Sequence, residues 1–243
     1  MTWEMDVDSR KSSAEPLSYD QMRELHRQEN IRDMRNIQAG IESRRRQKVA
    51  SGLAKLFEQQ IPPCLSGSSF ECMNRDYDNQ VRIINTVRKY TSDLINGQNE
   101  GSNLVLTGPP GTGKSHMLVA MMNIAASNGL IACYVSMPHL VRTLHLCVQG
   151  ETGYSVAGAL ELLKQADVLL IDEIGRHKAT EFNKSFIWDL VDAMHQAQKP
   201  IVAATNSSAA ELRQLFDPAA MNRLIDRGSQ LLVCDWESYR GRA

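Results

Sequence analysis

Short apolar runs alternate with longer stretches of helical periodicity over most of this chain. The runs typical of buried strands occupy residues 103–107, 130–136, 167–172, 200–205 and 229–235. The patterns typical of helices occupy residues 78–96, 114–127, 137–147, 155–165, 179–197 and 208–226. Strands and helices that alternate in this way form a parallel sheet with helices on both faces. The pattern therefore predicts an α/β fold.

The first sixty residues follow a different and mostly polar pattern. We expect residues 1–17 to be disordered, and Ser18-Tyr19-Asp20-Gln21 resembles a capping box that begins a long helix. Ile61-Pro62-Pro63 ends this helix near Gln60. Its apolar positions are sparse, namely Met22, Leu25, Ile31, Met34, Ile37 and Ile41. Such a segment buries little surface against itself, so it is either a solvated helix or an arm that binds a partner.

Composition limits the remaining choices. The 243 residues, 42% of them hydrophobic, suffice for one large domain with an appendage, so we expect a helical arm over 1–60 and an α/β domain over 61–243. No apolar run is long enough to cross a bilayer, and the acidic N-terminus lacks the apolar centre of a secretion signal. Five scattered cysteines without a C-x-x-C pair are typical of reduced thiols. These features together favour a cytoplasmic protein.

The stretch from Gly108 to Ser115 fits the phosphate-loop pattern G-x-x-x-x-G-K-[ST] at every fixed position. It lies between an expected strand and an expected helix, which is the context that this motif requires. Glycines allow backbone N–H groups to surround phosphate oxygens, while Lys114 would reach the β- and γ-phosphates and Ser115 would hold Mg²⁺. The alternative is a turn before a core helix. The residues expected to contact ATP are Gly108, Pro109, Pro110, Gly111, Thr112, Gly113, Lys114, Ser115 and His116.

Polar side chains follow two further apolar strands. Asp172 and Glu173 end the run at 167–172, and Asn206 follows the run at 200–205. In open parallel sheets, ligands bind at the carboxyl ends of the strands. Asp172 would then hold Mg²⁺, Glu173 would activate the attacking water, and Asn206 would hydrogen-bond the γ-phosphate or that water. Taken alone, the acids could be solvated and Thr205-Asn206 could simply begin a loop.

These strand ends together resemble those of the AAA+ ATPases, with Asp172-Glu173 as the Walker B motif and Asn206 as sensor 1. Over residues 61–243 the resemblance narrows to the DnaC-type replicative helicase loaders of bacteria and phages. It is carried by Gly108-Pro-Pro-Gly-Thr-Gly-Lys-Ser-His116, Leu170-Ile-Asp-Glu-Ile-Gly175, Ala204-Thr-Asn-Ser207 and Asp235-Trp-Glu-Ser-Tyr-Arg240. The resemblance implies an AAA+ P-loop core with an N-terminal helical arm, bound ATP and Mg²⁺, and self-association through shared ATP sites.

The resemblance also implies functional residues outside these motifs. Arg223 corresponds to the arginine that reaches into the ATP site of a neighbouring subunit, and Arg240 occupies a position like that of sensor 2. Single-stranded DNA would be contacted near Thr180 and Phe182, at the start of the helix after Asp172-Glu173. The spacing of Phe182 to Phe186, Leu190 and Met194 leaves a core role equally open. Lys178 and His177 are further candidates for phosphate contacts.

The expected function is therefore an ATPase that binds a hexameric replicative helicase through its N-terminal arm and delivers it onto single-stranded DNA. Two alternatives remain open. An IstB-type transposition helper shares the ATPase core, although the ending Trp236–Arg240 and the long arm favour the loader. A nucleotide-dependent adaptor would bind a partner without hydrolysing ATP, but the presence of Glu173 argues for hydrolysis.

Overall fold

The structure is a computed structural model that describes residues 18–57, 61–176, 180–216, 218–225 and 228–239. The disorder expected for residues 1–17 lies outside the described residues. The chain divides into two compact units, residues 1–45 and 46–243. This division falls within the expected arm, so the arm over 1–60 as a functional domain stays a prediction. No helix in the described ranges is both long and apolar enough to cross a membrane.

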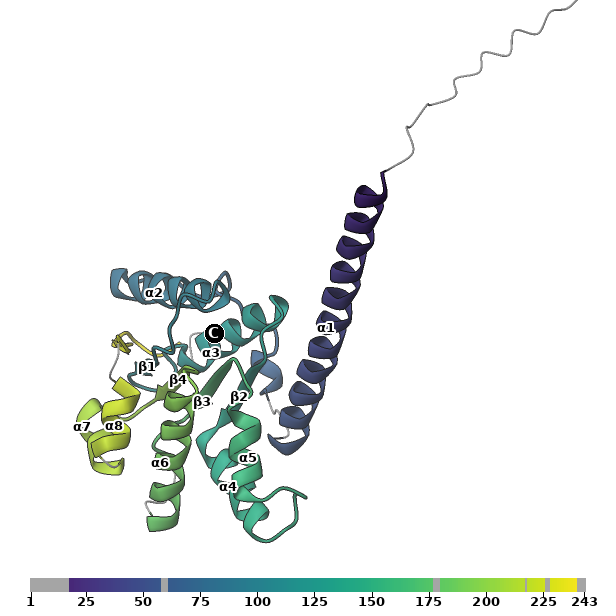
Figure 1. The fold of residues 1–243 in the computed structure, drawn as a ribbon. Helices are drawn as coiled ribbons and strands as arrows, with labels where there is room; N and C mark the ends of the chain where they lie inside the picture. Colours follow the sequence, from purple (N-terminus) through teal and green to yellow (C-terminus); the bar gives the residue numbers. More distant parts are fainter. Residues whose placement is uncertain (1–17, 58–60, 177–179, 217, 226–227, 240–243) are drawn as a thin grey trace, which may run out of the picture. The chain divides into compact units, whose positions relative to one another are not determined.

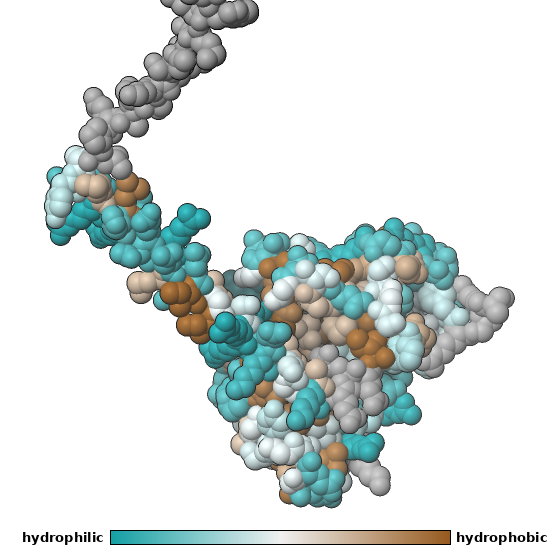
Figure 2. Space-filling model, turned by 90° about the vertical axis from the view of Figure 1, so that its right-hand side faces the viewer, coloured by the Kyte–Doolittle hydropathy of each residue, from teal (hydrophilic) through white to brown (hydrophobic). Residues whose placement is uncertain are grey.

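The first unit is described as one helical segment, the amino-terminal part of α1 (Tyr19–Phe57). The expected capping box begins it: the Ser18 backbone N–H donates to Gln21 Oε1 over 2.8 Å, and the Gln21 N–H donates to Ser18 Oγ over 3.3 Å. Every described residue up to Arg45 is exposed. Figure 2 shows brown apolar patches that interrupt the teal surface of this helix. The six sparse apolar residues expected from the sequence are all exposed there.

The second unit begins with the last turns of α1. Val49, Leu53, Leu56 and Phe57 are buried within this unit, because their spacing places them on one side of the helix. The short 3₁₀ helix η1 (Pro63–Leu65) follows. The remaining helices are α2 (Asp78–Ile95), α3 (Lys114–Ser127), α4 (Met137–Val148), α5 (Val156–Leu163), α6 (Glu181–Gln196), α7 (Ala209–Leu215) and α8 (Pro218–Ile225).

Five parallel strands form the sheet of the second unit. They are β1 (Leu104–Thr107), β2 (Ala132–Ser136), β3 (Val168–Asp172), β4 (Ile201–Thr205) and β5 (Gln230–Val233). Their order is β2-β3-β4-β1-β5, with every neighbouring pair parallel. Figure 1 labels β2, β3, β4 and β1 in this order. The carboxyl ends of β1, β3 and β4 therefore meet at one edge. This is the edge where ligands bind in such sheets.

Two apolar clusters cover the two faces of the sheet. Alternate strand residues supply each cluster, so that Leu104 and Leu106 pack with α2 and α3, while Val105 packs with α4, α5, α6 and α8. Because both faces are covered, β1, β3 and β4 are buried throughout and apolar up to their last residue. The expected α/β class and its flanked parallel sheet are confirmed.

The single helix expected over 208–226 is wrong, because two helices occupy this range. Phe216 has an extended backbone, with φ −107° and ψ 150°, where α7 ends. Pro218 begins α8, and a proline ring within a continuous helix would clash with the preceding turn and remove a hydrogen bond. The apolar residues of the two segments follow one helical periodicity, which predicts a single helix. Pro218 instead ends that continuity and begins a second helix.

Candidate nucleotide-binding site

The phosphate loop connects β1 to α3. Three of its glycines have backbone angles that favour glycine, with φ of 143° at Gly108, 84° at Gly111 and 89° at Gly113. At Gly108 a Cβ atom would lie 2.2 Å from the carbonyl oxygen of Cys234, so only glycine fits against the segment that follows β5. Gly113 is the N-cap of α3 and has no side chain to cap the helix, which leaves its amino end to attract an anion.

Lys114 is held within the curve of this loop. Its ammonium donates to the carbonyl oxygens of Gly108 and Pro109, each over 2.7 Å, and to the Thr112 hydroxyl over 3.3 Å. The residue is only 6% exposed. These contacts fix the lysine beside the backbone that would surround phosphate oxygens.

The segment after β5 is hydrogen-bonded to the backbone of the phosphate loop. The Trp236 indole N–H donates to the Thr112 carbonyl over 3.1 Å, and the Tyr239 backbone N–H donates to the Gly111 carbonyl over 3.0 Å. Trp236 is buried in the same apolar cluster as α3. The ending motif recognised in the sequence thus contacts the loop directly.

Asp172 and Glu173 lie where β3 ends. Asp172 is 7% exposed; its Oδ2 accepts from the Tyr134 hydroxyl and its Oδ1 from the Glu173 backbone N–H, each over 2.8 Å. Burial, reinforced by the negative charge of Asp172, raises the pKa of Tyr134 well above its usual range, so its hydroxyl stays protonated and donates. Glu173 Oε1 pairs with Arg176 Nη1 over 2.6 Å.

The turn that follows Asp172 and Glu173 is hydrogen-bonded to the end of β4. The Ile174 N–H donates to the Ala204 carbonyl over 2.8 Å, and the Thr205 hydroxyl donates to the Ile174 carbonyl over 2.7 Å. Glu173 itself has φ of 54°, a conformation uncommon for a residue other than glycine. The end of β4 therefore holds the position of the Glu173 backbone.

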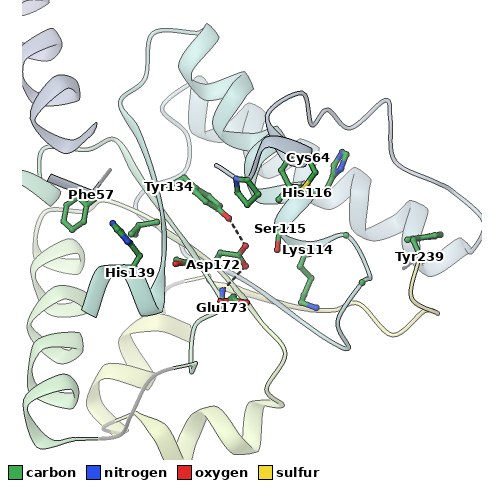
Figure 3. A pocket seen from close by; sticks show the side chains of 16 residues that line it. Phe57, Cys64, Lys114, Ser115, His116, Tyr134, His139, Asp172, Glu173 and Tyr239 are labelled. Atoms are coloured by element: carbon green, nitrogen blue, oxygen red, sulfur yellow. Dashed lines mark hydrogen bonds between the residues drawn. The ribbon is translucent and has the colours of Figure 1, made fainter. Parts of the chain in front are cut away.

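One cleft of about 610 Å³ brings the loop and the carboxylates together. Figure 3 shows Lys114, Ser115, Asp172 and Glu173 around it, with Tyr134 hydrogen-bonded to Asp172. Its volume is typical of a small-molecule site. Its lining residues are Phe57, Pro62, Cys64, Leu65, Gly111, Gly113, Lys114, Ser115, His116, Tyr134, Val135, Ser136, His139, Asp172, Glu173 and Tyr239.

The donor groups of this cleft fit a magnesium nucleotide. Glycine N–H groups and the Lys114 ammonium suit phosphate oxygens. The Ser115 hydroxyl and the Asp172 carboxylate supply the hard oxygen ligands that Mg²⁺ prefers, and both face the cleft. His116 lines the same cleft, with its Nε2 hydrogen-bonded to the Ser69 carbonyl at 2.8 Å.

Two of the expected catalytic residues are not among the described residues that line this cleft. Asn206 is exposed directly after β4, at the same edge of the sheet, and Arg223 lies on α8; neither is among the described residues that line the cleft. Arg223 pairs with Asp192 over 2.9 Å, and its guanidinium lies 4.8 Å from the centre of the Trp188 ring. A role of Arg223 toward its own chain's cleft is therefore not supported.

The expected DNA-contact residues lie around the start of α6. The Thr180 hydroxyl caps this helix by accepting from the Asn183 N–H over 3.2 Å. Phe182 is 40% exposed, and its ring centre lies 4.9 Å from that of His145. The buried face of α6 instead comprises Asn183, Phe186, Ile187, Leu190, Val191 and Met194. His177, Lys178 and Arg240 lie outside the described residues.

Sequence reasoning missed Tyr134 and Arg176. Tyr134 reads as one more residue of a buried strand, and its role depends on the pairing of β2 with β3, which aligns Ser136 with Asp172. A hydroxyl near the carboxyl end of an apolar strand is the one available signal. Arg176 stands three residues after Glu173, a spacing that lets the two side chains meet only because the chain turns there.

Comparison with known proteins identifies the family. The profile of the IstB-like ATP binding proteins matches residues 6–243. The chain belongs to this family. Among the curated relatives of this IstB-like chain, the replicative helicase loader DnaC of Escherichia coli strain K12 is 25% identical over 198 residues, which are 81% of this chain and 79% of that protein. The resemblance to DnaC-type loaders expected from the sequence is confirmed, and this IstB-like chain is an ATP-binding protein.

Solved structures confirm the AAA+ fold of the IstB-like chain. A crystal structure of the DnaC helicase loader superposes with a TM-score of 0.61 at 20% identity, covering 70% of this chain and 98% of that one. The structure of DnaI gives 0.60 at 17% identity, covering 71% and 94%. AMPPCP-bound DnaA from Aquifex aeolicus gives 0.57 at 20% identity; the match covers 68% of this chain and 49% of that longer chain.

Proposed function

We propose that this protein is an ATP-dependent loader that binds a hexameric replicative DNA helicase and delivers it onto single-stranded DNA at the start of replication. It acts in the cytoplasm, and hydrolysis serves as a switch. The observation that carries the proposal is the meeting of the phosphate loop with Asp172 and Glu173 in one cleft, in a chain related to DnaC. The DNA-contact residues stay those expected around the start of α6.

The residues of the cleft have separate tasks in ATP hydrolysis. Lys114 and the glycine N–H groups bind the β- and γ-phosphates. Glu173 accepts the proton of the attacking water, for which its carboxylate must turn from Arg176 toward the cleft. Ser115 and Asp172 would hold Mg²⁺, which supplies positive charge against the triphosphate. Asn206 would orient the γ-phosphate or the water from the end of β4.

The neighbouring subunit completes the site in this proposal. The side chain of Arg223 is 31% exposed on α8, and Arg223 is not among the described residues that line its own chain's cleft. Its Nη1 is buried against Asp192, so a second copy would reach the guanidinium once this pair opens. An arginine provided in this way neutralises charge that develops on the γ-phosphoryl group. Self-association would therefore control hydrolysis.

The exposed helix of the first unit supports a helicase-binding arm. Met34, Ile37 and Ile41 are each 62% exposed and recur at spacings of three and four residues, so they share one side of α1. A helix with such a stripe binds a groove or a second helix of a partner. The arm therefore supplies the helicase contact.

A second candidate function is that of an IstB-type transposition helper, which the name of the matching family favours. The two functions share the ATPase core and differ in the partner. A nucleotide-dependent adaptor that never hydrolyses ATP is disfavoured by Glu173, which lines the cleft beside the phosphate loop.

Co-purification of the full chain with a purified hexameric replicative helicase, with and without ATP, tests the proposal. We expect the helicase to co-elute, and we expect the effect of ATP to vanish in Lys114→Ala. Combined Met34→Glu, Ile37→Glu and Ile41→Glu substitutions should abolish co-elution. Asn36→Glu, Gln38→Glu and Ser43→Glu, which add the same charge at exposed polar positions of α1, should not. A helicase that fails to bind under either condition, while a transposase binds, would favour the second candidate.

A further inference from the structure

Tyr134 and Asp172 form a buried hydrogen bond beside the phosphate loop. Tyr134 is 3% exposed on β2, and Asp172 is 7% exposed at the end of β3. The two strands are neighbours, and Tyr134 is aligned with Leu170, two residues before Asp172. The phenol therefore reaches toward the strand end, where its hydroxyl donates to Asp172 Oδ2 over 2.8 Å (Figure 3).

The second carboxylate oxygen of Asp172 is also fixed. Its Oδ1 accepts from the Glu173 N–H over 2.8 Å, so one donor restrains each oxygen. Both donors are neutral, and within the described part of the chain no lysine or arginine forms an ion pair with Asp172. A buried carboxylate is costly without a cation. The two hydrogen bonds thus orient the Asp172 carboxylate, and its negative charge can be neutralised by a cation that binds together with a ligand.

We propose that Tyr134 is a positioning residue that aims the Asp172 carboxylate at the Mg²⁺ of a bound magnesium nucleotide. This inference rests on the proposed function in one respect, namely that Asp172 is the magnesium ligand. The backbone N–H restrains one oxygen only, and the phenol hydroxyl prevents the carboxylate plane from rotating about that bond. Hydrogen bonds of this kind to metal ligands typically alter metal affinity about 10- to 100-fold when removed.

Tyr90 provides a matched control for this hydroxyl. It is 4% exposed, and its hydroxyl donates to the Ser102 carbonyl over 2.5 Å. It lies on α2, in the same apolar cluster as Tyr134, and is not among the described residues lining the cleft. Tyr90→Phe therefore removes a buried hydroxyl that donates a hydrogen bond, while leaving the Asp172 carboxylate untouched.

Titration of MgCl₂ into the full chain with a fluorescent ATP analogue tests the proposal. Tyr134→Phe should raise the half-saturating Mg²⁺ concentration about tenfold. Its affinity for the analogue at saturating Mg²⁺ should match that of the wild type, because the phosphate loop is unchanged. Tyr90→Phe should leave the half-saturating concentration unchanged. A Tyr134→Phe variant that requires no more Mg²⁺ than the wild type would overturn the proposal.

A second measurement keeps the hydroxyl and does not depend on the folding of the variant. With 3-fluorotyrosine at position 134 alone, the ¹⁹F resonance should shift when Mg²⁺ is added to the analogue complex; the same label at position 90 should not respond. An unresponsive label at position 134 overturns the proposal. If the wild type itself shows no Mg²⁺-dependent nucleotide binding, the proposed function fails as well. If the wild type binds magnesium nucleotide and helicase while Tyr134→Phe behaves identically, only the role of Tyr134 is wrong.

Discussion

Glu173 has an uncommon backbone conformation, and its side chain forms a solvent-exposed ion pair with Arg176. A non-glycine residue at φ of 54° costs on the order of 1–3 kcal/mol, and the hydrogen bonds that anchor the turn to β4 maintain it. Its partner Arg176 is 74% exposed. Pairs this exposed are readily broken in water. The carboxylate is therefore held by Arg176 at rest, but only loosely.

Arg176→Ala should raise the basal rate of ATP hydrolysis. Without the guanidinium, Glu173 spends more time turned toward the cleft, and an exposed pair of up to about 1 kcal/mol corresponds to a rise of at most about fivefold. Phosphate release at saturating ATP measures this.

The pair Lys184–Glu181, at 3.0 Å, supplies the control, because Lys184→Ala breaks a similar exposed pair on α6 that does not include Glu173. Glu173→Gln should abolish hydrolysis with or without Arg176. A basal rate that falls in Arg176→Ala would instead mean that Arg176 assists catalysis.

The sequence predicts those site residues whose type is required by the ligand itself. The shape and charge of a phosphate constrain Gly108, Gly113, Lys114 and Ser115, so their pattern can be recognised from a single sequence. The role of Tyr134 cannot be predicted in this way, because it depends on which strand lies beside β3. The same limit applies to the Arg223 pair with Asp192, which joins two helices distant in sequence.

At the scale of elements, Asp167 joins four segments at the amino end of the sheet. Its carboxylate accepts from the Arg46 guanidinium of α1 over 2.5 Å, from Lys199 before β4 over 3.0 Å and from the Ile131 N–H before β2 over 2.8 Å. Burial alone would raise the pKa of Asp167, but these three donors hold it below its usual value. The last turns of α1 are thereby tied to the start of β3.

Asp167→Asn should lower the free energy of unfolding at pH 7 by about 1–3 kcal/mol, because two charge-assisted hydrogen bonds are lost. A depressed pKa in the folded state contributes stability above the unfolded value near 3.9, and this contribution is lost as the pH falls through the folded pKa. The difference between wild type and variant should therefore shrink below about pH 4. Urea denaturation at several pH values measures it.

Asp93→Asn is the comparison variant, since Asp93 pairs with Lys89 on the surface of α2, where Lys89 is 75% exposed. It should change the free energy of unfolding by less than about 0.5 kcal/mol. If Asp167→Asn behaves like Asp93→Asn at pH 7, then Asp167 does not tie these elements together.

Elements were predicted well where one physical signal dominates. Strands β1, β3 and β4 are buried along their whole length, and each of the five strands lies within the range expected from the sequence. The prediction of one helix over 208–226 was wrong because two short helices share one periodicity across Pro218. Val49, Leu53, Leu56 and Phe57 repeat at the spacing of a buried helical face, but their role depends on the second unit that buries them.

At the scale of the whole molecule, the proposed shared ATP site makes activity depend on pairs of chains. Arg223→Ala should bind ATP almost normally, because Arg223 is not among the described residues lining its own cleft. It should lose assembly-stimulated hydrolysis, to which such arginines contribute roughly 10³–10⁵-fold in well-studied cases. Lys114→Ala should lose ATP binding instead.

Mixing the two variants provides the decisive measurement, since each supplies what the other lacks and phosphate release should partly return. Asp192→Asn controls for the lost pairing of Arg223 within its own chain. It should retain stimulated hydrolysis if the guanidinium acts on a neighbour. A verified mixed assembly that stays as inactive as either variant alone would show Arg223 to be structural.

The contact of Gly108 with the Cys234 carbonyl has a consequence for biosynthesis. β1 lies between β4 and β5, and the phosphate loop rests on residues 234–239, more than a hundred positions later in the chain. A ribosome releases a chain from its amino end, so the loop motif emerges long before its support. We therefore expect a nascent chain stalled before residue 230 to carry the complete motif yet fail to retain nucleotide.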